Sequence, residues 1–193
     1  MDARRIAQMV VAVAATLAGT PALALDEAAL WAALRERPGL VVVMRHAQVG
    51  RGDGARWDPS GGCAGETMLT ERGRAEAAAI GRRFAEVGLT PDRLEVVSSA
   101  MCRTRDTAML AFGKARLDAA LREFFSGGGR MNEAMDAAEG WVRRLRGPRP
   151  LVLLTHLPNI DALTGLQPDH DRAVVAESDE SGQLSVLGTI RVH

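Results

Sequence analysis

Three short, mainly apolar runs constrain the fold of this chain more than any other feature of its sequence. They are Leu40–Met44, Leu94–Val97 and Leu151–Leu154. Each has the length of a strand, and they lack the strict polar-apolar alternation of a strand with one solvated face. Such runs are typical of strands buried on both faces, as in parallel sheets. The sequence therefore predicts a parallel sheet at the centre of the molecule.

Helical patterns alternate with these strands. Asp26 and Thr70 are suitable N-caps for the first two helices, and Gly113 follows the third. The predicted helices are Asp26–Arg37, Glu71–Val87, Met101–Phe112, Asn132–Leu145 and Pro158–Leu163, and two late strands cover Ala173–Ala176 and Leu184–Ile190. This order predicts an α/β three-layer sandwich, with a mostly parallel, doubly wound sheet and helices on both faces.

The first 24 residues have the layout of a secretory signal peptide. Arg4 and Arg5 precede an apolar run from Ile6 to Leu17, and small residues stand at Ala22 and Ala24. An uncleaved anchor is the alternative, but the run is shorter than the roughly 20 residues that a spanning helix needs. We expect cleavage after Ala24, one domain over residues 25–193, no lasting membrane insertion, and a periplasmic or secreted protein.

The overall charge argues against one class of partner. Lys and Arg number 24, and so do Asp and Glu, so the net charge is zero and a generally basic surface for nucleic acid is not expected. In an oxidising compartment the two cysteines, Cys63 and Cys102, can form a disulfide. Sequence spacing leaves this pairing and a pair of buried thiols equally open.

Polar, reactive side chains directly follow all three central strands. Arg45 and His46 follow the first, Ser99 and Arg103 the second, and His156 the third. In open α/β sheets, ligands bind beyond the carboxyl ends of the strands. If these strands are neighbours, the five residues converge on one pocket.

The chemistry of this set favours a phosphate. Arg45 and Arg103 can each form two hydrogen bonds to a tetrahedral oxyanion. Their charges lower the pKa of neighbouring histidines, and a neutral imidazole such as that of His46 is a nucleophile. Arg103 also lies in the first turn of a helix, whose backbone amides are expected to add to the anion site. The two arginines oppose a cation, so neither a metal nor another cofactor is expected.

Four segments resemble the histidine phosphatase superfamily, which contains the phosphoglycerate mutases and acid phosphatases. They are Val42–Ala47, Leu69–Arg74, Ser98–Ala108 and Leu153–His156, the last with Asn159 shortly after it. They stand in the family's order along nearly the whole predicted mature chain. Within the superfamily the chain is most similar to small exported members, such as the lipopolysaccharide core heptose phosphatase.

The resemblance implies a role for each residue of the site. His46 would accept the phosphoryl group, while Arg45, Arg103 and His156 would hold the phosphate, with further substrate contacts from Ser99 and Asn159. It implies an exported phosphomonoesterase that acts through a phosphohistidine on a small phosphorylated substrate, such as a sugar phosphate of the envelope.

The group that protonates the leaving alcohol is less well specified by the sequence. Glu123 stands about where many relatives place a glutamate, and Asp58 and Glu66 compete with it. The glycine-rich segment from Gly50 to Gly65 is a long loop, which is expected to shape the entrance.

Two other functions remain open from the sequence. One is a protein phosphohistidine phosphatase, and the other is a non-catalytic, anion-binding envelope protein that kept the pocket. His170 and His193 belong to no pattern and are predicted to be exposed.

Overall fold

The computed structural model describes residues 25–51, 56–125 and 130–193. The predicted signal peptide lies outside the described residues, and its cleavage stays a prediction. The segment 52–55 of the predicted entrance loop also lies outside the described residues. Within the described ranges, no helix combines the length and the apolar character that crossing a bilayer would need.

In the part of the chain that the structure describes, six strands form one mixed sheet. Their order is β3-β2-β4-β1-β5-β6, with β3, β2, β4 and β1 parallel, β5 antiparallel to β1, and β6 antiparallel to β5. The bounds are β1 Leu40–Arg45, β2 Glu95–Ser99, β3 Arg116–Asp118, β4 Leu151–Thr155, β5 Arg172–Ser178 and β6 Leu184–Arg191. The predicted mostly parallel α/β sheet is confirmed. The sequence reading missed only β3, a three-residue edge strand without a buried side chain.

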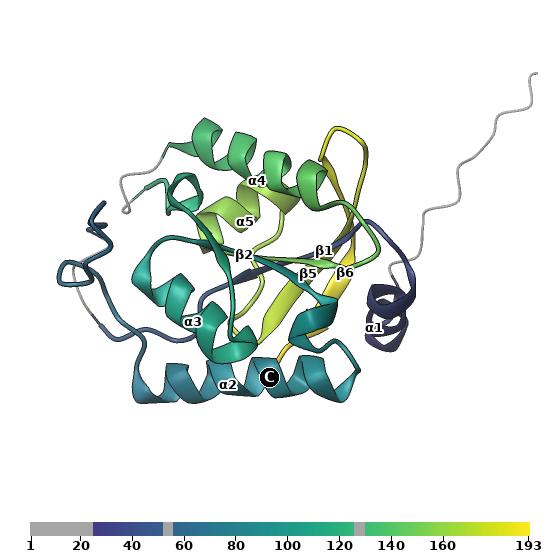
Figure 1. The fold of residues 1–193 in the computed structure, drawn as a ribbon, viewed down its shortest axis with the longest axis horizontal. Helices are drawn as coiled ribbons and strands as arrows, with labels where there is room; N and C mark the ends of the chain where they lie inside the picture. The colour runs from purple at the N-terminus through teal and green to yellow at the C-terminus, as the bar shows by residue number, and fades with distance from the viewer. Residues whose placement is uncertain (1–24, 52–55, 126–129) are drawn as a thin grey trace, which may run out of the picture.

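Among the described residues, five α-helices cover the sheet. They are α1 Glu27–Glu36, α2 Glu71–Glu86, α3 Cys102–Phe112, α4 Met131–Leu145 and α5 Leu157–Thr164, with 3₁₀ turns at Pro91–Arg93 and Ala119–Leu121. Helices α2 and α3 lie on one side of the sheet and α4 and α5 on the other, while α1 flanks the end near β6 (Figure 1). This is the predicted three-layer sandwich.

The predicted helix ends are also confirmed. The Asp26 carboxylate accepts a hydrogen bond from the Ala29 amide at 2.8 Å, and the Thr70 hydroxyl accepts one from the Gly73 amide at 2.9 Å. Both are N-caps that satisfy an otherwise unpaired backbone donor. Gly113 ends α3 with φ at 68°, in the left-handed region that favours glycine.

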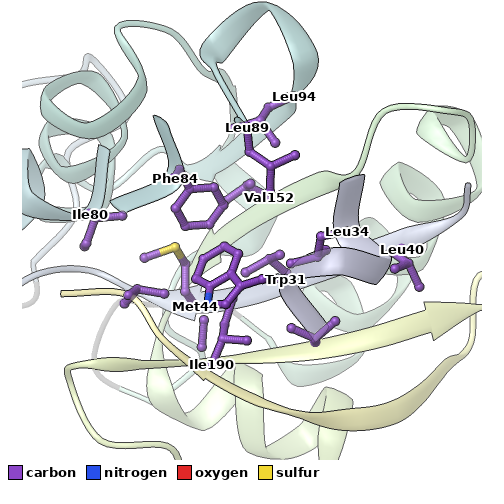
Figure 2. Packing of buried hydrophobic residues seen from close by; sticks show 14 of the residues in the cluster. Trp31, Leu34, Leu40, Met44, Ile80, Phe84, Leu89, Leu94, Val152 and Ile190 are labelled. Carbon is purple, nitrogen blue, oxygen red and sulfur yellow. The ribbon is translucent and has the colours of Figure 1, made fainter. Parts of the chain in front are cut away.

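Successive residues of β1 contribute to the cores on opposite faces of the sheet. Met44 packs in the cluster that contains Trp31 and Phe84, whose rings meet edge to face (Figure 2). The ring of Phe112 meets that of Phe84 in the same way. Val43 lies in the second cluster, under α4 and α5. Both side chains are almost completely buried, which explains why this strand reads as a continuous apolar run.

The strand order brings the polar strand ends together. Strand β4 lies between β2 and β1, with Arg45 paired to Thr155 and Ser98 paired to Leu154. All three strands are parallel, so their carboxyl ends share one edge of the sheet. The predicted site residues follow at this edge.

Candidate active site

His46 is held as a neutral imidazole at the end of β1. The residue is 6 % exposed, and its Nδ1 lies 2.8 Å from the carbonyl oxygen of Ala47. Because a carbonyl only accepts, Nδ1 carries the proton and Nε2 keeps a free lone pair. Burial, with smaller contributions from the charges of Arg103 and Arg45, lowers the pKa of His46 to about 3 against the opposing hydrogen bond to the Ala47 carbonyl. The ring is therefore an unprotonated nucleophile at neutral pH.

A buried threonine ties this strand end to α3. The Thr107 hydroxyl accepts a hydrogen bond from the Ala47 amide at 3.0 Å and donates one to the carbonyl of Arg103 at 2.7 Å. The side chain is fully buried. It fixes the backbone beside His46 relative to the helix that carries Arg103.

His156 is fully buried beside His46, with their ring centroids 5.6 Å apart. Its Nδ1 lies 3.3 Å from Nη2 of Arg103, and its Nε2 lies 3.0 Å from the Ser99 hydroxyl. A guanidinium only donates, so Nδ1 accepts and Nε2 carries the proton toward Ser99. Burial, then repulsion from the two arginines and from His46 whenever that ring is protonated, holds the pKa of His156 well below its ordinary value. Ser99 therefore supports His156 from behind, and its predicted contact with substrate stays a prediction.

The two arginines of the site present buried donors that make no hydrogen bond to the described residues. These are Nε of Arg45 and Nη1 of Arg103. The side chain of Arg103 is 5 % exposed. Nη1 of Arg103 has the Glu66 carboxylate 3.7 Å away. Because native proteins pair nearly all buried polar groups, the unpaired Nε of Arg45, close to the charge of Arg103 and to a neutral histidine, indicates a site for an external anion.

Glu123 reaches the same arginine from the other side. Its Oε2 lies 3.2 Å from Nη2 of Arg103, and its side chain is 21 % exposed. The turn before it is held by Asn159, whose Nδ2 donates to the carbonyls of Leu121 and Arg122, each at 3.1 Å. Asn159 itself is 1 % exposed. It therefore helps to place Glu123, and its predicted contact with substrate stays a prediction.

The other two carboxyl groups proposed as acids lie differently. The Asp58 carboxylate accepts a hydrogen bond from the Ser60 amide at 2.8 Å, within a turn of its own loop. The Glu66 side chain is 1 % exposed and accepts a hydrogen bond from the Cys102 amide at 2.8 Å. Glu123 is thus the one of the three that joins contact with Arg103 to partial solvent access.

Glu66 also corrects one expectation. The amides at the start of α3 were expected to help bind the external anion. The structure places the Glu66 carboxylate there, where it accepts from the amide of Cys102 and faces that of Arg103. An anion of the chain itself already occupies this helix end, so the arginine side chains are left to bind phosphate.

The prediction that His170 and His193 are exposed is wrong. Both are half-buried, and the ring of His170 lies 6.2 Å from that of His46. Burial, followed by the charge of Arg45, lowers the pKa of His170, while Glu76 opposes the shift. The loop before β5 reaches the site because β5 runs antiparallel to β1, a pairing that a single sequence does not reveal.

Cys63 and Cys102 form a disulfide, with their Cα atoms 5.9 Å apart, which resolves the alternative left open by the sequence. Among the residues placed by the structure, no three His, Cys, Asp or Glu side chains are grouped so that they could hold a metal ion. The arrangement can therefore bind an oxyanion between two arginines and present a nucleophilic imidazole to it.

Comparison with known proteins decides the family. Residues 41–152, more than half of the chain, match the model of the histidine phosphatase superfamily (branch 1). The chain belongs to this superfamily. It is a phosphatase, and its α/β sandwich is the phosphoglycerate mutase-like fold. The comparison with curated proteins found no match.

Solved structures of similar fold include phosphatases with different substrates. The protein histidine phosphatase SixA, complexed with tungstate, is 15% identical with a TM-score of 0.56, covering 79% of this chain and 97% of its own. Rv3214 from Mycobacterium tuberculosis is 19% identical with a TM-score of 0.55, covering 81% and 100%. The mycobacterial glucosyl-3-phosphoglycerate phosphatase Rv2419c, in complex with inorganic phosphate, is 19% identical with a TM-score of 0.52, covering 76% and 93%. At these identities the likeness establishes the shared fold.

Proposed function

We propose that this protein is an exported phosphomonoesterase that hydrolyses a small phosphate ester through a phosphohistidine on His46. The observation that carries the proposal is the neutral His46, with Nε2 unprotonated, beside Arg103 and beside Arg45, whose buried Nε makes no hydrogen bond to the described residues. This combination supplies both a nucleophile and fixed positive charge for a transferring phosphoryl group.

The reaction would run in two displacements. Nε2 of His46 attacks phosphorus, the ester P–O bond breaks, and the leaving oxygen takes a proton from Glu123. Water then attacks the phosphohistidine and returns a proton to Glu123 as the P–N bond breaks and phosphate leaves. Arg45 and Arg103 stabilise the charge on the equatorial oxygens in both steps.

Glu123 would change partners during this cycle. Without substrate its carboxylate pairs with Arg103. A phosphate dianion that binds Arg103 would compete with the Glu123 carboxylate for that guanidinium. Binding of the substrate would thus release Glu123 from its ion pair beside the ester oxygen.

Two observations support export. Residues 1–24 have the layout of a signal peptide, and the cysteine pair is joined in a disulfide, which persists in oxidising compartments such as the periplasm. In that setting an envelope sugar phosphate of the kind handled by the heptose phosphatase branch is the substrate class that we propose.

The mature chain, residues 25–193, provides the test. We expect His46→Gln to lower turnover of an aryl phosphate by about a thousandfold or more while the fold is kept. In the wild type, rapid quenching followed by intact-mass measurement is expected to trap one phosphoryl group that is stable in base and labile in acid. Activity of His46→Gln within a few-fold of the wild type would exclude the nucleophile.

Protein phosphohistidine phosphatase activity is the alternative that the fold permits, since SixA shares the fold. A side-by-side assay of sugar phosphates and a phosphohistidine peptide separates the two. Preference for the peptide by a factor of about ten in kcat/KM would replace our substrate class and keep the chemistry.

A further inference from the structure

A second buried carboxylate stands behind the phosphate site and takes no part in the reaction described above. Glu66 has a side chain that is 1 % exposed, and its Oε2 accepts a hydrogen bond from the Cys102 amide at 2.8 Å. The same oxygen lies 3.7 Å from Nη1 of Arg103. One carboxylate thus contacts both the start of α3 and the guanidinium carried by its first turn.

The N-terminus of α3 has no cap of its own. Its N-cap residue, Met101, supplies no side-chain hydrogen bond, so the first amides of the helix depend on Glu66, 36 residues earlier in the chain. A negative charge at this end of a helix is also favoured by the helix dipole. Burial in this position raises the pKa of Glu66, while the adjacent amides and arginines oppose that shift.

The loop that carries Glu66 is fastened to the same helix turn. The Cys63–Cys102 disulfide joins the loop to the first residue of α3, and the Glu66 amide donates to the Cys63 carbonyl at 3.1 Å. Arg105, one turn into the helix, donates to the sulfur of Cys63 at 3.2 Å and to the carbonyl of Gly61 at 3.4 Å. Glu66 therefore sits on a covalently anchored loop three residues beyond Cys63.

We propose that Glu66 is a positioning residue that fixes the guanidinium of Arg103 for the phosphoryl group, and that the Cys63–Cys102 disulfide delivers Glu66 to it. The long Arg103 side chain could otherwise adopt different conformations, in contact with Glu123, with His156 or with an incoming anion. Glu66 holds Nη1 from behind, so Nη2 stays on the side of Glu123 and His156. Without this restraint, the long Arg103 side chain would sample several rotamers and would have to be ordered each time a phosphoryl group binds.

The sign of one measurement separates positioning from simple charge. The proposal rests on the proposed function, because it assumes that Arg103 binds the phosphoryl group. Its test is the binding of vanadate, an analogue of the transferring phosphoryl group, measured by calorimetry on residues 25–193. Glu66→Gln keeps an oxygen for the Cys102 amide and removes the negative charge. If Glu66 acted only through its charge, its removal would tighten anion binding. We expect the opposite, an increase of about tenfold in the vanadate Kd.

A double-mutant cycle tests whether the effect passes through Arg103. With Arg103→Gln in place, Glu66→Gln is expected to change the vanadate Kd by less than about twofold, since the group that it positions is gone. The matched control is Glu95→Gln, which replaces another arginine-paired glutamate, at the amino end of the parallel strands. This variant is expected to leave the vanadate Kd unchanged. Tighter or unchanged binding in Glu66→Gln, or a full additional loss in the double variant, would overturn the proposal.

A separate variant tests the part assigned to the disulfide. Replacing Cys63 and Cys102 together by serine is expected to raise the vanadate Kd several-fold, and adding Glu66→Gln to that variant is expected to add less than it does to the wild type. Wild-type affinity in the serine variant would overturn the part assigned to the disulfide. Because binding is measured, these outcomes stand whether or not the wild type hydrolyses an ester, so failure of the proposed function is seen separately in turnover.

Discussion

The two ends of the same parallel strands both pair glutamates with arginines, and they do so in opposite ways. At the carboxyl end, the arginine is buried, with Arg103 5 % exposed between Glu66 and Glu123. At the amino end, Glu95 is the buried partner, 11 % exposed in its side chain, and it pairs with Arg116 and Arg149, which are 55% and 52% exposed.

The difference lies in which group remains unsatisfied. Around Glu95, each arginine can complete its hydrogen bonds with water, so the cluster needs no further ligand. Around Arg103, Nη1 faces Glu66 at 3.7 Å but makes no hydrogen bond to any described residue, and the buried Nε of Arg45 likewise makes none. Buried cations with free donors select an external anion, whereas exposed cations around a buried carboxylate stabilise the fold.

The largest expected effect tests this contrast with one substitution at each end. Arg103→Gln should lower kcat/KM for an aryl phosphate by about a thousandfold, because it removes a buried, charged donor from the transferring phosphoryl group. Arg116→Gln should leave it unchanged. Steady-state kinetics at matched ionic strength decide the matter, and comparable losses in the two variants would erase the distinction between the ends.

A smaller effect is expected at the carboxylate that shares Arg103. Glu123→Gln should lower turnover of an alkyl phosphate by about a hundredfold, since an alkoxide leaves poorly without a proton. Turnover of an activated aryl phosphate, whose leaving group needs no proton, should fall by less than a few-fold. Equal losses on both esters would assign Glu123 to binding and remove it as the acid.

The main residues of this end could be predicted from the sequence, because they follow their strands directly. His46 and His156 follow from the three buried strands in the sequence, and these strands are neighbours in the sheet. Glu66 and His170 could not be assigned in the same way. Glu66 meets the start of α3 across 36 residues, and His170 arrives through the antiparallel β5, so both depend on long-range packing.

A third prediction uses the neutral histidines, which occur at the carboxyl end. The folded pKa of His46 is about 3 against an ordinary 6.5, so between these values the unfolded chain binds more protons. Stability is therefore complete above pH 6.5 and falls as the pH drops toward 3. Between pH 6.5 and pH 5, the shifted pKa of His46 lowers the free energy of unfolding by about 2 kcal/mol.

Urea unfolding at the two pH values measures this loss. His46→Gln should lose less stability than the wild type over the same interval, because the loss caused by His46 is absent. The loss caused by His156, whose pKa is also lowered, remains in both proteins. The comparison of the two proteins cancels carboxyl groups such as Glu66, whose raised pKa acts in the other direction. Equal slopes in both would mean that His46 is not held neutral by its burial.

The smallest effect belongs to the amino end and completes the contrast. Glu95→Gln removes the charge that Arg116 and Arg149 share, but both arginines keep their water. Screening by solvent limits the loss to about 1 kcal/mol of unfolding free energy, and added salt should shrink it. Urea unfolding at low and high salt measures the loss, and kinetics on the same samples should match the wild type. A fall in kcat/KM would mean that the two ends of the sheet are coupled, and that Arg103 is positioned by more than the groups around it.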